Sequence, residues 1–169
     1  MDFHDENFEA ESEEIGSDEL LADDRLRLPE DASILVRVHA VRAWLLRRQK
    51  ETGLEVGEAA LALQQLYQDE AGQVSRLRQR ELQKLVQREQ QQLEGAQQRL
   101  KAFEEAQELL EESLTHTTTG ERALVEYYLT LDDLLNPLHE EEEEHPLPWR
   151  QALAEVQHRV EHVGTSREE

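Results

Sequence analysis

Apolar residues recur at helical spacing along most of the chain, and this pattern predicts an all-α protein. A first amphipathic helix is expected at residues 32–53, with Asp31 or Ser33 as its N-cap. Gly53 follows a basic last turn, which is typical of a helix end, and Gly57 marks the other side of the predicted break. Its apolar positions are Ile34, Leu35, Val38, Val41, Leu45 and Leu46.

The strongest helical pattern covers residues 58–114, a stretch without proline. Apolar positions first repeat every 11 residues and later every seven, so the segment predicts a long, glutamine-rich coiled-coil helix roughly 85 Å in length. A single amphipathic helix would leave its seam in water. The seam therefore requires a partner helix, either from a second chain in a homodimer or from the helix at 32–53. The predicted oligomer interface comprises Leu63, Val74, Leu82, Leu85, Leu93, Leu100, Phe103 and Leu110.

A helical hairpin is predicted for residues 118–164. Thr118 or Thr119 can cap its first helix, which should end near Leu135 because Asn136 and a proline follow. An acidic loop at 139–145 then leads into a last helix. The predicted hairpin core comprises Leu124, Tyr128, Leu131, Leu135, Trp149, Val156 and Val160.

Residues 1–31 differ from the rest of the chain, because they hold 13 acidic and 2 basic side chains. Such a segment buries too little apolar surface to offset its ordering entropy, so it is predicted to be a disordered acidic tail. The leucines between Leu20 and Leu28 leave an alternative open, a short docking segment that orders on a partner.

Candidate chemistry is sparse. The chain has no cysteine and no phosphate-binding or dinucleotide-binding motif. His158 and His162 have the i, i+4 spacing of a metal pair but lack a third ligand, and the neighbouring Asp132 and Asp133 should point apart on a helix. We therefore predict no catalytic residue, no cofactor and no metal site, and we do not expect an enzyme.

Charge and hydropathy limit the partners. The net charge of −21 repels nucleic acid over most of the surface. No run approaches ~18 apolar residues, so no membrane span is expected. Residues 1–14 are acidic and do not form a signal peptide, so we expect a cytoplasmic protein.

The order of parts resembles GrpE, the nucleotide exchange factor of Hsp70 chaperones. An acidic start precedes a long paired helix and a pair of short helices. The segment from Thr130 to Leu134, followed by Leu138, is similar to a segment in the family's first bundle helix, and Val156, Val160 and Gly164 are similar to its last. The resemblance is to a divergent, truncated member, because only five residues follow Gly164 and the family's β-rich wing is missing.

Two function classes follow from these features. The first is a non-catalytic coiled-coil adaptor that self-associates and binds other proteins, for which a ParA-type positioning ATPase is one candidate partner. The second, which the resemblance implies, is a co-chaperone that promotes nucleotide exchange on Hsp70. The missing wing favours the adaptor.

Overall fold

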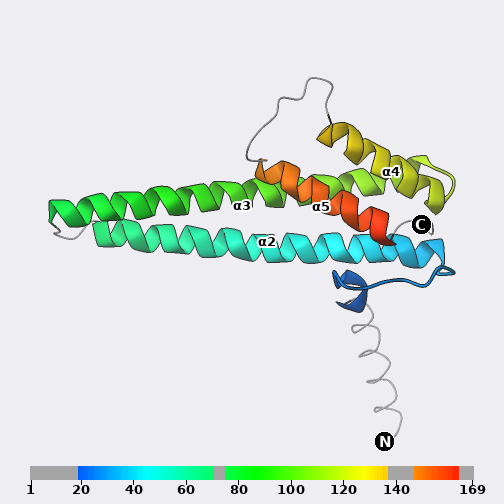
Figure 1. Cartoon of the computed structure of the whole chain (residues 1–169), viewed down its shortest axis with the longest axis horizontal. Coiled ribbons are helices and arrows are strands. Elements are labelled where there is room, and N and C mark those ends of the chain that lie inside the picture. Colours follow the sequence, from blue (N-terminus) through cyan, green and yellow to red (C-terminus); the bar gives the residue numbers. More distant parts are fainter. Residues whose placement is uncertain (1–18, 71–74, 137–146, 164–169) are drawn as a thin grey trace, which may run out of the picture.

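The computed structural model describes residues 19–70, 75–136 and 147–163, and the part of the chain that it describes is helical with no strand. Figure 1 shows two long helices side by side and two short helices packed along one end of them. The elements are α2 (Ile34–Glu70), α3 (Arg76–His116), α4 (Gly120–Leu135) and α5 (Pro148–Val163). The all-α prediction is therefore confirmed.

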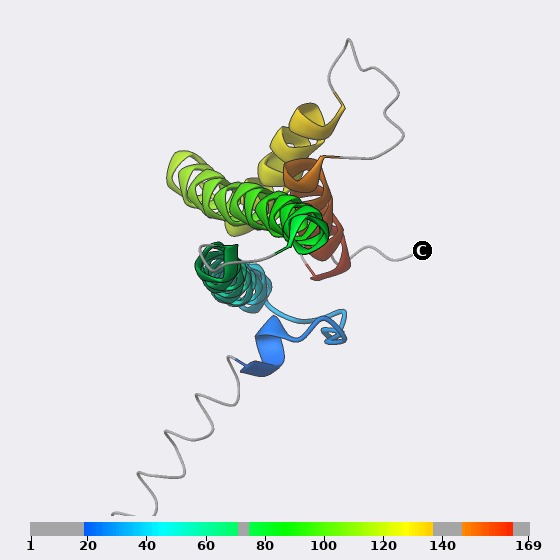
Figure 2. The same ribbon diagram turned by 90° about the vertical axis from the view of Figure 1, so that its left-hand side faces the viewer.

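The core lies where the first half of α2, the second half of α3, α4 and α5 meet (Figure 2). Trp44 and Phe103 pack edge to face at its centre, with ring centroids 6.0 Å apart. Small side chains on α3 let the other helices approach closely. The buried residues are Val38, Ala40, Val41, Trp44, Leu45, Ala102, Phe103, Ala106, Leu110, Leu124, Tyr127, Leu131, Leu135, Ala152, Leu153, Val156, Val160 and Val163.

The predicted break between Gly53 and Gly57 does not occur, because α2 runs through both glycines. Glycine in a helix costs about 1 kcal/mol relative to alanine, which is less than the burial gained by continuing the helix. Thr52 and Ala59 are buried and Val56 is half-buried. These side chains are three to four residues apart, so they lie on one side of α2 and pack against α3. Because this packing continues past Gly57, the expected 32–53 helix extends far beyond its predicted end.

The expected rod at 58–114 is instead divided between α2 and α3. Helix α3 begins after Ser75, whose hydroxyl accepts a hydrogen bond of 3.2 Å from the Arg78 amide. The two helices fold back on each other in antiparallel orientation (Figures 1 and 2). Of the two partners left open for the seam, the chain's own N-terminal helix is the one observed.

Residues 19–31, here called the strap, lie against α2 and α5 (Figure 1). The strap begins with a helical turn at 19–22, and Ala22 is buried. Leu21 and Leu28 pack against the core. The expectation of a disordered tail through residue 31 is thus wrong for these residues, because their leucines find an apolar surface on the protein itself. Residues 1–18 lie outside the described residues.

The predicted helical hairpin is confirmed as α4 and α5. Thr119 caps α4 by accepting a hydrogen bond from the Arg122 amide, and α4 ends at Leu135 as expected. The acidic loop at 139–145 lies outside the described residues. No helix in the described ranges has the length and apolar character that crossing a membrane requires.

Candidate functional site

Six of the eight residues predicted to form an oligomer interface are buried or half-buried within the chain. Leu82, Phe103 and Leu110 are buried within one chain, and Leu63, Leu93 and Leu100 are half-buried. Leu85 is exposed, and Val74 lies outside the described residues. Because α2, α4 and α5 already cover Phe103 and Leu110, neither side chain is accessible to a second chain in this fold.

The predicted hairpin core is brought together largely as expected. Leu124, Leu131, Leu135, Val156 and Val160 are buried, whereas Tyr128 and Trp149 pack at its edge.

Within the described ranges, the carboxylates and histidines do not converge on a reaction centre. No group of three or more metal-ligating side chains occurs among the described residues. His158 and His162 stack on the exposed side of α5 with ring centroids 6.3 Å apart. Asp132 accepts hydrogen bonds from Asn136 and Gln157, while Asp133 is exposed. The hydrogen bonds of Asp132 stabilise the end of α4 and its packing against α5.

Tyr127 is the most deeply buried titratable group of α4. Its hydroxyl donates a hydrogen bond of 2.7 Å to the backbone oxygen of Ala106. Burial raises the pKa of Tyr127 well above its usual value, so the phenol stays neutral at physiological pH. The residue ties α4 to α3 and has no opening to solvent through which a substrate could reach it.

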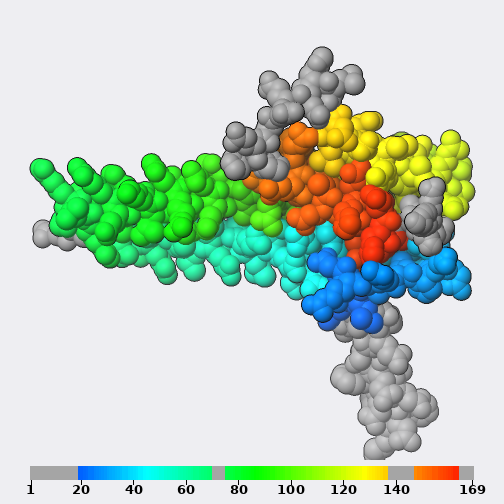
Figure 3. All heavy atoms as spheres, viewed as in Figure 1, coloured from blue at the N-terminus to red at the C-terminus, as the bar shows by residue number. Residues whose placement is uncertain are grey.

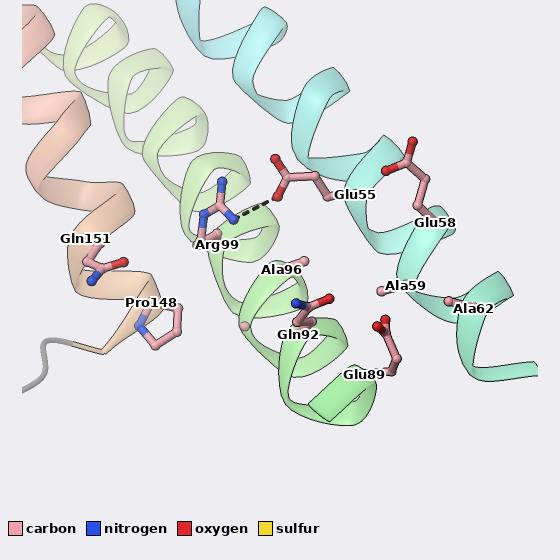
Figure 4. Close-up of a pocket in the computed structure, with 11 residues that line it drawn as sticks. Glu55, Glu58, Ala59, Ala62, Glu89, Gln92, Ala96, Arg99, Pro148 and Gln151 are labelled. Carbon is pink, nitrogen blue, oxygen red and sulfur yellow. Dashed lines mark hydrogen bonds and ion pairs between the residues drawn. The ribbon is translucent and has the colours of Figure 1, made fainter. Parts of the chain in front are cut away.

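An acidic groove opens where the start of α5 meets the middle of the α2–α3 pair (Figure 4). It has a volume of about 590 Å³. Its walls carry Glu58 and Glu89, and a third carboxylate, Glu55, pairs with Arg99 at 2.8 Å. The rest of the lining consists of the small residues Ala59, Ala62, Gly95 and Ala96 together with Gln92, Pro148 and Gln151. A wide groove lined by carboxylates, amides and small residues suits a basic protein surface better than a small metabolite.

Three side chains hold the strap. Arg37 donates hydrogen bonds to the backbone oxygens of Pro29 and Glu30, each at 3.1 Å, and to that of Val163 at 3.0 Å. The Trp44 indole donates to the Asp24 carboxylate, and Arg159 donates to the backbone oxygen of Leu21.

Arg159 is buried beneath the strap, and its Nε and Nη1 atoms have no hydrogen-bond partner among the described residues. Burial lowers the pKa of Arg159, while the charges of Asp24 and Asp23 oppose that shift. The strap's acidic side chains therefore help to keep this cation in the interior.

A two-helix arm extends past the short helices (Figure 3). This distal arm comprises residues 62–69 of α2 and 76–92 of α3. Leu82 is buried in its seam, and Gln90 donates a hydrogen bond of 2.9 Å to the Tyr67 hydroxyl across it. Leu77 is 74% exposed and Leu85 is 41% exposed, so the arm carries apolar side chains on its surface.

Sequence reasoning missed several residues that organise these surfaces. Neither Arg37 nor Arg159 was singled out from the sequence, although each is buried on an otherwise apolar face of its helix. Trp44 directly precedes Leu45, an apolar position of the predicted helix, so its place in the core could have been predicted from the sequence. Nothing in the local sequence indicates that Asp24 contacts Trp44.

Comparisons with known proteins give no family for this chain. No family model matches it, and no match was found among curated proteins or among solved structures.

Proposed function

We propose that this protein is a non-catalytic adaptor that self-associates and binds other proteins through its helical surfaces. The observation that carries the binding of other proteins is the distal arm, which extends beyond the four-helix core and exposes Leu77 and Leu85 (Figures 1 and 3). A protein binds partners most readily through apolar side chains that its own fold leaves in water.

The acidic groove supports the same proposal from a different side. Glu58 on α2 and Glu89 on α3 both line this groove beside alanines at the base of the arm (Figure 4). A helix with small and basic residues complements such a groove in shape and in charge.

A photo-crosslinking amino acid placed at Leu77 in the full chain tests the proposal inside the source cell. We expect one or a few discrete adducts. The matched control places the same group at Ala154, an exposed position on α5 away from the arm. Equal labelling from both positions, or no discrete adduct from Leu77, would contradict binding through the arm.

Two narrower assignments stay predictions. A GrpE-like activity predicts faster ADP release from an Hsp70 when the protein is added. A positioning-ATPase partner predicts stimulated ATP hydrolysis by a ParA-type enzyme. Action in the cytoplasm is likewise a prediction, which fractionation of the source cell tests.

A further inference from the structure

One face of α2 points away from the rest of the molecule and carries large apolar side chains. Leu46 is 52% exposed, Leu54 is 62% exposed and Leu61 is 57% exposed. Leu54 and Leu61 each follow a seam residue, Thr52 or Ala59, by two positions. Two positions correspond to ~200° around a helix, so both leucines lie opposite α3. We call Leu46, Gly53, Leu54, Gly57 and Leu61 the outer face of α2.

The two glycines of this face are not required by the fold. A Cβ atom added at Gly53 or Gly57 would meet no atom within 4 Å. No described glycine has a positive φ, so neither position needs glycine for its backbone conformation. Alanine would make a more stable helix at both places. Gly57 lies one turn from Leu54 and one turn from Leu61, and because it has no side chain the helix surface is lower there than at the two leucines. We call this place the depression at Gly57.

The charges of α2 are separated along its length. Residues 34–50 contain five basic and no acidic side chains, and residues 51–69 contain four acidic and no basic side chains. Several of these side chains pair within the chain, among them Arg42 with Glu111 and Arg48 with Glu155. Lys50 is exposed on the outer face, and Glu58, one turn after Leu54, is exposed at the edge of that face beside the acidic groove. A second α2 in antiparallel orientation brings each basic half near an acidic half, whereas a parallel one brings like charges together.

From these observations we infer that the outer face of α2 binds the same face of a second copy of this chain, in antiparallel orientation. In this pairing Leu54 of one copy packs into the depression at Gly57 of the other. Lys50 of each copy then lies within about one turn of Glu58 of the other. The inference rests on the self-association in the proposed function, to which it adds the surface and the orientation.

Substitutions at the outer face separate association from folding. We expect Gly57→Ala to raise the urea midpoint of the dilute protein, because alanine favours the helix more than glycine does. The same substitution should weaken dimerisation about tenfold or more, because the added methyl group fills the depression. We expect Leu54→Glu to abolish the dimer in analytical ultracentrifugation. Leu77→Glu, a matched change on the distal arm, should leave the dimer unchanged.

The distance between two spin labels distinguishes the two orientations. A single introduced cysteine can carry the label, because the chain has no native cysteine. A label on Gln68→Cys should lie roughly 35–40 Å from its counterpart in the antiparallel pair. In that pair Gln68 of one copy opposes Ala43 of the other, and each residue between Ala43 and Gln68 adds ~1.5 Å along the helix. A parallel pair would instead bring the two labels to about 10 Å.

A short label distance would overturn the orientation, and a dimer unaffected by Gly57→Ala and Leu54→Glu would overturn the surface. In both cases the arm crosslinks at Leu77 would still test partner binding independently. A chain that stays monomeric up to about 100 micromolar would overturn both this inference and the proposed self-association.

Discussion

The indole nitrogen of Trp44 donates a hydrogen bond of 2.5 Å to the carboxylate of Asp24, a residue 20 positions earlier in the chain. This contact joins the acidic strap to the centre of the core, because the same indole packs against Phe103. An acidic segment that the sequence alone predicts to be disordered is thereby attached to the folded body.

Removing the Asp24 carboxylate should loosen the strap without unfolding the protein. One hydrogen bond contributes about 0.5–1.5 kcal/mol, so Asp24→Ala should speed amide exchange in residues 21–26 by about three- to tenfold. Hydrogen exchange with mass spectrometry measures the change. Asp31→Ala removes the same charge from an exposed position and serves as the control. Equal effects from the two variants would show that net charge, not the Trp44 contact, holds the strap.

Phe103→Ala should destabilise the single chain by about 3–5 kcal/mol, because the ring is fully buried and its loss leaves a cavity. The loss should not depend on protein concentration, since the ring is covered by helices of its own chain. Chemical denaturation at two concentrations measures it. Leu85→Ala, at an exposed position on the same helix, should cost less than about 1 kcal/mol. A loss that appears only in dilute protein would place Phe103 between chains instead.

Tyr127 should make the protein less stable at alkaline pH. Burial raises its pKa in the folded state, whereas the unfolded residue titrates near ~10. Above that pH the unfolded chain loses a proton that the folded chain keeps, so the free energy of unfolding falls as pH rises. For one group the fall is at most about 1.4 kcal/mol per pH unit. Tyr127→Phe should reduce this slope, although it also removes the hydrogen bond from the Tyr127 hydroxyl to the Ala106 oxygen. Tyr67→Phe, at an exposed phenol, should not reduce it.

The Arg42–Glu111 pair should contribute modestly near neutral pH. Two contacts, of 2.7 and 2.8 Å, join α2 to α3, and the hydrogen bond from Arg42 lowers the pKa of Glu111. The stability from this pair is therefore present above the unfolded pKa of ~4.3 and is lost as pH falls through the lower folded value. Both side chains are about two-fifths exposed, so Glu111→Gln should cost no more than about 1 kcal/mol at pH 7. The difference from wild type should shrink as pH falls below ~4.3. A constant difference across pH would point to packing instead.

The sequence by itself determined the helical class, the position of most helix ends and the inward face of the short helices. The hydroxyl oxygens of Ser33 and Thr119 cap α2 and α4 by accepting hydrogen bonds from the amides three residues later. The apolar spacing of Leu124, Leu131, Val156 and Val160 matches their burial. These features depend on interactions between residues a few positions apart, which a local pattern contains.

Only the tertiary structure decided where the long helical region folds back and which helix fills its seam. Gly53 and Gly57 carry a local signal for a break, but each costs only about 1 kcal/mol, and the burial of Thr52 and Ala59 against α3 exceeds that cost. An apolar repeat shows that a helix needs a partner, but it does not distinguish a second chain from a neighbouring helix of the same chain. That choice, like the contact between Asp24 and Trp44, depends on the sum of many distant contacts, and it is settled only when the whole chain packs.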